Sequence, residues 1–483
     1  MIYKMNNMKL LITIAILTPS IQTADIDIVW HGGEKTANVS TTEMSPGSRA
    51  EGGLWFDDNS KSYLFGGWSY NSVSKEFTLT NDLWVLDVNT FHWSILKPVS
   101  KNKPSSRHSP SICGIPSRMI VIFGGIDQDG NKLDDTWIYN LVDNSWEELT
   151  LSGNSSTSSH PPERGHQSSW CTSTKLIIFG GRNAEHKALH DMWSFSLVNQ
   201  KWSEMESSKK YPSNSFGQTI VSYPKPRSGA TTFHQGSLYL FGGDTAVIDS
   251  GETYVDGKYA NDLWSYDIGK DSWTKIGGND NVCHHGSYGH FQVASKDNWP
   301  GCRVKATGWV DTNGNLWMFG GDGSDSTAES VTVFKPGRLL NDLWRYEFVF
   351  KMWSWMGGNK YGNTGGKYGE SSSESYPGSR TGFMSFNRYH NFHHIFGGFG
   401  HDTNGKDGLL SDLWEIDVHK EVVYGKYPTT SNVFMIIFGL CGLILLIVAL
   451  SLYNRKFFRG SEKEKDKKSD TEYCMLTNID DED

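Results

Sequence analysis

The stretch Asn261-Asp-Leu-Trp-Ser-Tyr-Asp-Ile-Gly-Lys-Asp-Ser-Trp273 decides the fold of this chain, together with Leu238-Tyr-Leu-Phe-Gly-Gly243 before it. In chain order, an apolar run that ends in Phe-Gly-Gly comes first. The second part is a Trp two residues after an Asp. This two-part signature occurs six times in the same order. We therefore predict a repeat architecture and call the copies units one to six.

Each unit carries the same set of marks. The Phe-Gly-Gly marks are Phe65, Gly66 and Gly67; Phe123, Gly124 and Gly125; Phe179, Gly180 and Gly181; Phe241, Gly242 and Gly243; Phe319, Gly320 and Gly321; and Phe396, Gly397 and Gly398. The Trp after each Asp is Trp84, Trp137, Trp193, Trp264, Trp344 or Trp414. An Arg precedes each Phe-Gly-Gly, at Arg49, Arg107, Arg164, Arg227, Arg303 and Arg380. In units one to five a second Trp follows nine residues later, whereas unit six has Val423 there.

These marks resemble the kelch repeat, in the form found in attractin and galactose-oxidase-like propellers, over roughly residues 25 to 420. The resemblance implies an all-β, six-bladed kelch propeller in which each blade has strands a to d and strand a lines the channel. The residues support strands independently, because short apolar runs alternate with Gly, Asn and Asp clusters. The glycine pair permits positive φ and close approach of another backbone. We expect the Trp rings to pack between blades and their N–H groups to meet carbonyls.

Residues 25–33 resemble a strand d that has no blade of its own. Asp25-Ile-Asp-Ile-Val-Trp-His-Gly-Gly33 aligns with Met352-Trp-Ser-Trp-Met-Gly-Gly358, so that Trp30 falls on Trp355. Because unit six lacks its second Trp, we predict that this N-terminal strand completes the last blade. Such closure removes the exposed strand edges that an open array would have.

Loop lengths vary on one side of the predicted blades only. The a–b and c–d connections are nearly constant, whereas the b–c and d–a connections vary and are longest at 244–260, 277–301, 322–340 and 357–378. In an antiparallel blade the b–c and d–a loops emerge on the same face. We predict that this face recognises a ligand, since binding residues concentrate on loops of a rigid scaffold.

Both ends of the chain carry membrane signals. Residues 1–24 have the pattern of a secretory signal peptide. After the propeller (25–420) and a linker (421–432), residues 433–453 are apolar enough to form a transmembrane helix, and Arg455, Lys456 and Arg459 follow it. These features predict a single-pass type I protein of the plasma membrane or an endomembrane, with a cytoplasmic tail at 454–483. Tyr473 and Leu476 in the tail fit a sorting motif, and a plain solvated tail is the alternative.

Composition narrows the possible partners and cross-links. A formal net charge of −9 and the lack of a basic stripe argue against nucleic-acid binding. Among the six Cys, Cys283 and Cys302 flank one long loop and are the predicted disulfide. Cys113 and Cys171 fit ordinary buried thiols, with their disulfide status left open. Asn38 and Asn154 begin N-glycosylation sequons on the predicted luminal side.

No residue set in the sequence predicts catalysis, a cofactor or a metal. The six Arg and the six Asp (Asp82, Asp135, Asp191, Asp262, Asp342 and Asp412) recur at equivalent positions, which a scaffold explains. His284, His285 and His290 share one loop without a recurring ligand spacing, and a plain surface loop is the better interpretation. The adjacent His393 and His394 point to opposite faces of a predicted strand. The Tyr, His and Cys set of the galactose-oxidase copper site could not be placed.

The leading hypothesis is therefore a membrane-anchored kelch propeller that binds an extracellular or luminal protein or glycan, in adhesion or as a receptor. The alternative is a carbohydrate-active ectoenzyme, an oxidase or isomerase, on the same scaffold. We expect no enzyme activity, because no nucleophile elbow, Walker loop or dinucleotide fingerprint appears in the sequence.

Overall fold

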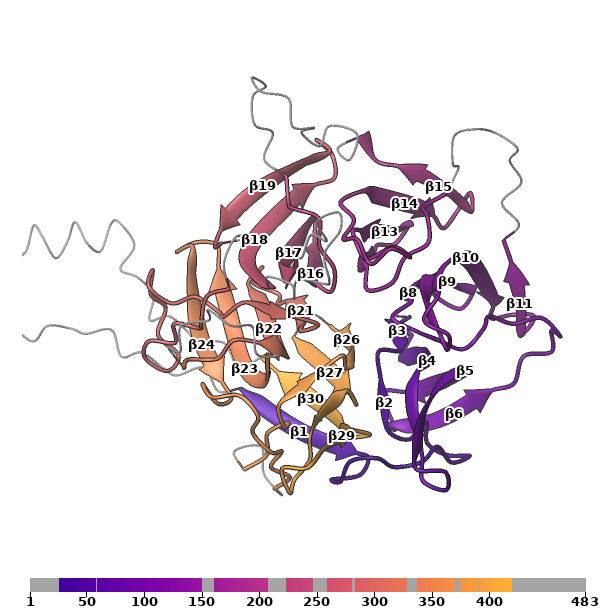
Figure 1. Cartoon of the computed structure of the whole chain (residues 1–483), viewed down its shortest axis with the longest axis horizontal. Helices are drawn as coiled ribbons and strands as arrows, with labels where there is room; N and C mark the ends of the chain where they lie inside the picture. Colours follow the sequence, from indigo (N-terminus) through magenta and orange to yellow (C-terminus); the bar gives the residue numbers. More distant parts are fainter. Residues whose placement is uncertain are drawn as a thin grey trace, which may run out of the picture. The chain divides into compact units, whose positions relative to one another are not determined.

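The computed structural model describes residues 26–57, 59–149, 160–206, 223–245, 259–279, 283–327, 337–369, 374–389 and 391–418. Its named elements are all β-strands. Residues Ala24–Glu421 form one compact unit, in which the sheets follow one another around a central axis (Figure 1). The predicted signal peptide, linker, membrane span and tail lie outside the described residues. Within the described ranges, no helix is both long and apolar enough to cross a bilayer.

Units one to three each form an antiparallel sheet. Unit one contains β2 (Arg49–Ala50), β3 (Gly53–Phe56), β4 (Lys61–Asn71), β5 (Glu76–Asp87) and β6 (His92–Leu96). Unit two contains β7 (Arg107–His108), β8 (Ser111–Ile115), β9 (Met119–Asp127), β10 (Lys132–Asn140) and β11 (Ser145–Glu148). Unit three contains β12 (Ser168–Cys171), β13 (Lys175–Phe179), β14 (Met192–Ser196) and β15 (Lys201–Glu204).

Units four to six repeat this strand order. Unit four contains β16 (Thr231–Gln235), β17 (Ser237–Asp244), β18 (Tyr259–Asp267) and β19 (Ser272–Gly277). Unit five contains β20 (Arg303–Val304), β21 (Thr307–Val310), β22 (Leu316–Gly323), β23 (Arg338–Glu347) and β24 (Met352–Gly357). Unit six contains β26 (Met384–Arg388), β27 (Phe392–Phe396) and β30 (Leu413–Asp417), and a smaller sheet of β25 (Arg380–Thr381), β28 (Phe399–His401) and β29 (Asp407–Leu409).

The N-terminal strand lies where the sequence predicts it. β1 (Asp27–Gly32) pairs antiparallel with β30, and Trp30 is opposite Trp414. In unit five, Trp355 of β24 is opposite Trp344 in the same way. The beginning of the chain thus supplies the outer strand of the sheet that contains its last described strands. At the register position of a second Trp, β1 carries Ile28, which is 3% exposed.

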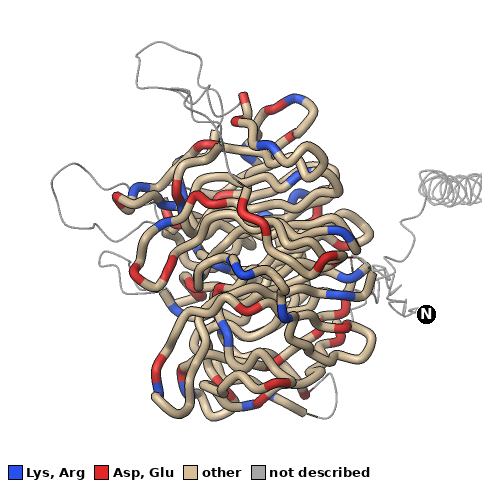
Figure 2. The backbone as a smooth tube through the Cα atoms, turned by 90° about the vertical axis from the view of Figure 1, so that its right-hand side faces the viewer, with Lys and Arg blue, Asp and Glu red and all other residues tan. Residues whose placement is uncertain are grey.

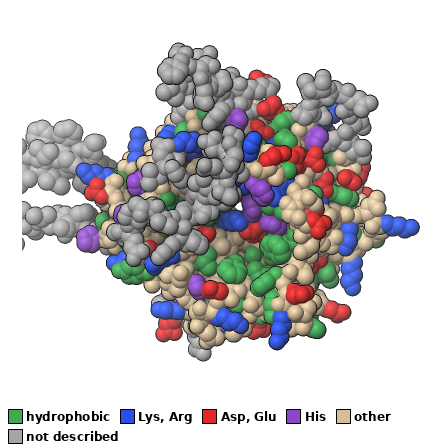
Figure 3. Space-filling model, in the orientation of Figure 1, with side chains coloured by type: hydrophobic (Ala, Val, Ile, Leu, Met, Phe, Trp, Pro, Cys, Tyr) green, Lys and Arg blue, Asp and Glu red, His purple; other side chains and the backbone are tan. Residues whose placement is uncertain are grey.

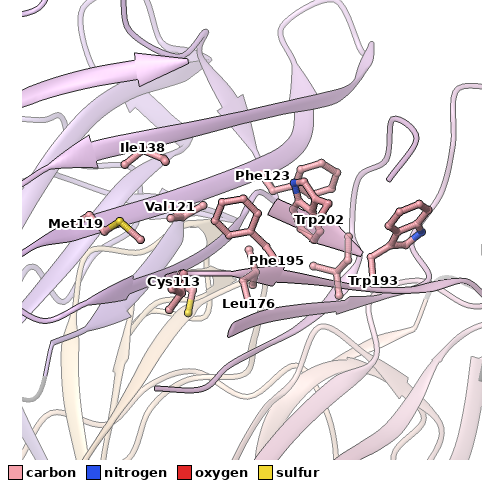
Figure 4. Close-up of a cluster of buried hydrophobic side chains, with 11 residues drawn as sticks. Cys113, Met119, Val121, Phe123, Ile138, Leu176, Trp193, Phe195 and Trp202 are labelled. Atoms are coloured by element: carbon pink, nitrogen blue, oxygen red, sulfur yellow. The ribbon is translucent and has the colours of Figure 1, made fainter. Parts of the chain in front are cut away.

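The core consists of aromatic contacts between neighbouring sheets. The second Trp of one unit packs on the Phe-Gly-Gly phenylalanine of the unit before it, as between Trp202 and Phe123, whose ring centroids are 4.7 Å apart. Equivalent pairs join Phe65 to Trp146, Phe179 to Trp273, Phe241 to Trp353 and Phe396 to Trp93. Figure 4 shows the cluster between units two and three, where Phe123 and Trp202 lie beside Phe195 and Leu176. Such aromatic pairs add about 0.5–1.5 kcal/mol each beyond the area they bury.

Each glycine pair allows the next unit to approach closely. Gly397 and Gly398 have φ values of +64° and +98°. A Cβ on Gly397 would lie 2.4 Å from the carbonyl oxygen of Arg49, which belongs to unit one. The neighbouring Gly398 N–H donates a hydrogen bond of 2.7 Å to that same oxygen. Glycine is therefore required both by the backbone conformation and by the space.

One buried ion pair recurs in all six units and connects strands a, b and c. In unit four, Arg227 Nη1 and Nη2 donate to the two carboxylate oxygens of Asp262 at 2.6 and 2.9 Å. Arg227 Nη1 also donates to the Gly242 carbonyl at 2.7 Å. Trp264 Nε1 donates to Asp262 Oδ2, so the first Trp of a unit meets a carboxylate, and the expectation of a carbonyl partner was wrong. We call this set of contacts the Arg–Asp–Trp triad.

The other five triads have the same connections. Their ion pairs are Arg49 with Asp82, Arg107 with Asp135, Arg164 with Asp191, Arg303 with Asp342, and Arg380 with Asp412. In each of them the Trp two residues after the Asp donates its indole N–H to the carboxylate. All six Arg side chains are fully buried. These contacts give the repeated Arg and Asp a structural role.

Replacing Arg227 with Ala should lower stability by about 3–5 kcal/mol, because Asp262 would remain buried without its partner. The matched control is Lys270→Ala, which removes an exposed ion pair with Asp267 in the same unit and should change stability by less than about 1 kcal/mol. Thermal unfolding of both variants measures the difference. An unchanged midpoint for Arg227→Ala would mean that the triad does not hold the sheet together.

Candidate ligand-binding site at the axis

Where they are described, the b–c loops of units five and six and the d–a loops before them meet on one face of the ring, as their lengths predicted. Gly286, in the d–a loop after unit four, donates its N–H to the Asp325 carbonyl in the b–c loop of unit five. Gly366 donates in the same way to Asp402, in the next pair of loops. We call this surface the long-loop face. Acidic and basic residues are interspersed along the described backbone (Figure 2).

Two of the long d–a loops pack back onto the scaffold in their described parts. Tyr288 donates its hydroxyl to Asp342 Oδ2 at 2.7 Å, and Tyr368 donates to Asp412 Oδ2 at 2.7 Å. Each Tyr therefore adds a donor to the triad of the following unit. From the sequence we assigned these loops to ligand recognition alone. This structural role was not predicted, because nothing in the sequence linked either Tyr to a triad.

At the centre of the long-loop face, six residues form a ring around the axis. Each lies two positions after a triad Arg, and each has a left-handed backbone: Glu51 (φ 59°), Ser109 (53°), His166 (56°), Gly229 (63°), Lys305 (53°) and Gly382 (59°). Backbone N–H groups connect neighbouring units, as from Ser109 to the Glu51 carbonyl at 2.6 Å and from Lys305 to Gly229 at 2.8 Å. Four of these residues are not glycine, and such strained positions concentrate at functional sites.

Four side chains of this ring and the neighbouring His108 form a charged network, which we call the axial cluster: Glu51, His108, Ser109, His166 and Lys305. Glu51 Oε2 lies 2.7 Å from His108 Nδ1 and accepts a hydrogen bond of 2.8 Å from the Ser109 hydroxyl. Lys305 Nζ forms an ion pair with Glu51 Oε1. The Ser109 hydroxyl is also 3.0 Å from His166 Nδ1. The cluster thus joins units one, two, three and five through side chains.

The surroundings of Glu51 and His166 set the charge states of these two side chains. Burial alone would raise the pKa of Glu51, but Lys305, His166 and His108 outweigh it and hold that pKa well below its usual range. Burial and then the charge of Lys305 lower the pKa of His166 to about 3. At neutral pH, Glu51 is therefore an anion and His166 is neutral. Since the Ser109 proton is donated to Glu51, Ser109 is poorly placed as a nucleophile activated by His166.

A cavity of about 350 Å³ opens beside the axial cluster. His166 and Lys305 line it from the ring, and Lys132, Arg182 and Asp244 line it from b–c regions. Arg182 and Asp244 form an ion pair of 2.6 Å. Its described lining carries three basic side chains and one acidic side chain. Because Arg182 is paired with Asp244 and Lys305 with Glu51, the excess positive charge comes mainly from Lys132, and it favours an anionic group.

A second cavity, of about 650 Å³, follows the axis along the strands a. Its lining includes Trp55, Trp170, Trp309 and His393. The ring of His393 stacks on Trp309 with centroids 4.1 Å apart. This aromatic lining agrees with strand a facing the channel. On the face shown in Figure 3, acidic and basic side chains are interspersed and histidines gather near the middle.

The cysteines form two disulfides in the described residues. Cys283 pairs with Cys302, which is the predicted pair. Cys113 pairs with Cys171, which decides the disulfide status that the sequence left open, and they are not ordinary buried thiols. Because Cys113 lies on β8 and Cys171 on β12, this bond joins two neighbouring units near the axis. Sequence spacing gave no signal for it, since the residues are 58 positions apart.

The remaining predicted residues lie outside the axial cluster or outside the described ranges. Asn38 is described, and its Oδ1 accepts a hydrogen bond from the Leu409 N–H at 2.9 Å. Asn154, Tyr473 and Leu476 lie outside the described residues. His284 contacts Asn279 in its own loop. His393 and His394 belong to different environments, as their adjacent positions on β27 predicted.

Stability should depend on pH through His166. In the unfolded state His166 binds a proton near pH 6.5, whereas in the folded state its pKa is about 3. The free energy of unfolding therefore falls as the pH drops from about 6.5 towards 3. His166→Asn removes the titration, and Asn tolerates a φ of 56°. This variant should lose less stability than the wild type between pH 7 and pH 4.5 in denaturant unfolding. His92→Asn, at an exposed position, should follow the wild type; equal pH slopes for all three proteins would contradict the prediction.

Comparison with known proteins agrees with this fold. The family model for the attractin/LZTR1 beta-propeller matches residues 30–299, more than half of the chain. F-box/kelch-repeat protein At1g51550 of Arabidopsis thaliana is 25% identical over 221 residues, covering 42% of this chain and 40% of that protein. Kelch domain-containing protein 10 of Homo sapiens is 28% identical over 158 residues, covering 32% and 34%. Kelch domain-containing protein 2 of Bos taurus is 26% identical over 218 residues, covering 41% and 49%.

The chain therefore matches less than half the length of each of these relatives. The family match, the six repeated triads and the ring of sheets all lead to one conclusion. The chain belongs to the attractin/LZTR1 family of kelch β-propellers.

Proposed function

We propose that this protein is a membrane-anchored binding module whose kelch propeller recognises a protein or glycan ligand on its long-loop face. The axial cluster carries this proposal. It combines four non-glycine residues in left-handed conformations with a charged network and an adjacent cavity. A scaffold of repeated triads has no need of these side chains, so they are best explained by a ligand.

The scaffold that presents this face is a six-bladed propeller. Each of the six sequence units contributes one sheet of matching strand order. The small sheet of β25, β28 and β29 belongs to unit six, because β25 occupies the place that β2, β7 and β20 hold in their own sheets. The N-terminal strand closes the ring, since β1 pairs with β30.

The sequence supports a type I membrane protein with an extracellular or luminal propeller. A leader at 1–24, an apolar span at 433–453 and basic residues directly after that span favour this orientation. The two disulfides fit an oxidising compartment. A nucleic-acid partner is disfavoured by the net charge of −9.

The axial cavity favours a ligand with an acidic group, either a carboxylate of a protein side chain or an acidic sugar. Lys132 supplies most of the excess positive charge at its wall, since Arg182 is paired with Asp244 and Lys305 with Glu51. The enzyme alternative gains no support from the axial cluster, because His166 with a pKa near 3 is a weak general base at neutral pH.

The ligand proposal is tested with the full-length chain on an array of acidic and neutral glycans and of cell-surface proteins. Lys132→Glu reverses one charge at the cavity and should weaken binding to the ligand found at least about tenfold, since each 1.4 kcal/mol is tenfold. Lys270→Glu makes the same change at an exposed position outside the cavity and should leave binding unchanged. Equal effects of the two variants would reject the cavity as the binding site.

The topology proposal is tested through the sequons at Asn38 and Asn154. The protein made in secretory-competent cells should shift to faster gel mobility after treatment with a peptide N-glycosidase. Asn38→Asp retains the oxygen that accepts the Leu409 N–H bond and removes the nitrogen that carries the glycan. Combined with Asn154→Gln, it should abolish the shift. A wild-type protein without any shift would contradict the luminal orientation.

A further inference from the structure

Three side chains from three strands meet in unit six, away from the axial cavity. His31 lies on β1, His394 on β27 and Glu415 on β30. Glu415 Oε2 is 2.9 Å from His394 Nε2 and 3.7 Å from His31 Nε2. One ligand atom from each residue can be chosen so that all lie within 4.8 Å of one another. We call this group of His31, His394 and Glu415 the closure cluster. It was not predicted from the sequence.

The two imidazoles point their nitrogens at the carboxylate without completing hydrogen bonds. His31 Nε2 and His394 Nε2 are buried, and neither forms a hydrogen bond of good geometry within the described residues. The side chain of His394 is 0% exposed. Their described partner is the Glu415 carboxylate, at ion-pair distance from both nitrogens. Buried polar atoms in native proteins rarely lack hydrogen bonds of good geometry, so a group that binds both nitrogens and the carboxylate would satisfy all three.

Packing fixes the orientation of both rings. His394 stacks on Phe386 with centroids 4.5 Å apart and an angle of 1° between the planes. His31 stacks on Phe91, in the c–d turn of unit one, at 3.8 Å. Rigid strands and stacked rings hold these ligand atoms in place, which is a requirement for a preorganised site.

The axial cluster offers a useful contrast. Glu51, His108 and His166 also bring three potential ligand atoms together. There, however, Lys305 Nζ already supplies the cation at Glu51, and Ser109 donates to the same carboxylate. In the closure cluster the nearby Arg388 donates to Val88 O and Asn89 Oδ1 in unit one. No described Lys or Arg forms an ion pair with Glu415.

We propose that His31, His394 and Glu415 bind a Zn²⁺ ion. Two imidazole nitrogens and one carboxylate are a common zinc ligand set. Tetrahedral zinc with bonds of about 2.0–2.2 Å separates neighbouring ligand atoms by about 3.3–3.6 Å, and the two measured separations, 2.9 and 3.7 Å, bracket this range. The side chains of His31 and Glu415 are 20% and 16% exposed, so water can reach the fourth position.

The ion would act as a cross-link at the closure of the ring. Its ligands come from the first described strand and from two strands near the end of the propeller, so binding requires β1 to be in place. An ion that binds only the folded ring stabilises it by mass action. The role is structural and independent of the ligand proposed for the long-loop face.

The test uses the full-length chain, purified in detergent, stripped with a chelator and dialysed against ZnCl2. Elemental analysis should give one zinc per chain, and zinc at 100 times its dissociation constant should raise the thermal midpoint by at least about 3 °C. His31→Gln removes a ligand at a partly exposed position, so it should fold and should bind zinc at least about 100-fold more weakly. Glu415→Gln provides a second variant, which keeps the shape and removes the charge.

The matched control is His92→Gln, which changes an exposed histidine outside the cluster. It should keep the wild-type stoichiometry and the wild-type rise in midpoint. Less than half an equivalent of zinc on the wild type would overturn the proposal. So would retention of tight binding in both His31→Gln and Glu415→Gln, because the ion would then bind elsewhere.

Discussion

The bidentate pair between the triad Arg and the Asp before the first Trp is the interaction on which the rest of the structure depends. A buried charge is costly unless its hydrogen-bonding positions are filled. Arg303 shows how this is done: two donors meet Asp342, one also meets the Gly320 carbonyl, and Nε donates to the Gly301 carbonyl. The Asp342 oxygens are completed by Trp344 and Tyr288. Because every member is satisfied, the network sets where strand a begins relative to strands b and c.

That constraint has a consequence for the axis. Once the Arg is fixed, the chain must turn inward within two residues to begin strand a, and it does so through a left-handed position in every unit. The backbone conformation is constant there, while the side chain varies among Glu, Ser, His, Gly and Lys. The scaffold thus keeps a left-handed position at six equivalent places, four of them strained by a non-glycine residue, and five residue types occupy them. A binding site can change at these positions without a change in the propeller.

Most of the fold could be predicted from the sequence, because the repeated residues make equivalent contacts in every unit. The alignment of Trp30 with Trp355 predicted both the partner and the register of β1. The axial cluster was missed for a physical reason. Its members come from four different units, and four of them share the second position after the triad Arg without sharing a residue type. The same applies to Cys113 and Cys171, which meet only because strands a of adjacent units run side by side around the axis.

The junction between units five and six differs from the others, and the reason lies in β1. Elsewhere a second Trp packs on the phenylalanine of the unit before it. At this junction the register position is filled by the smaller Ile28, and Phe319 packs on Phe383 and Tyr376 at centroid distances of 5.8 and 6.3 Å. The closing strand therefore contributes less aromatic packing than a strand d of its own unit would. Its attachment depends more on strand pairing with β30 and on its polar residues, and His31 is the one whose ring lies against unit one. A ring closed by a separate segment is held most weakly at that segment, so an additional cross-link there stabilises the whole circle.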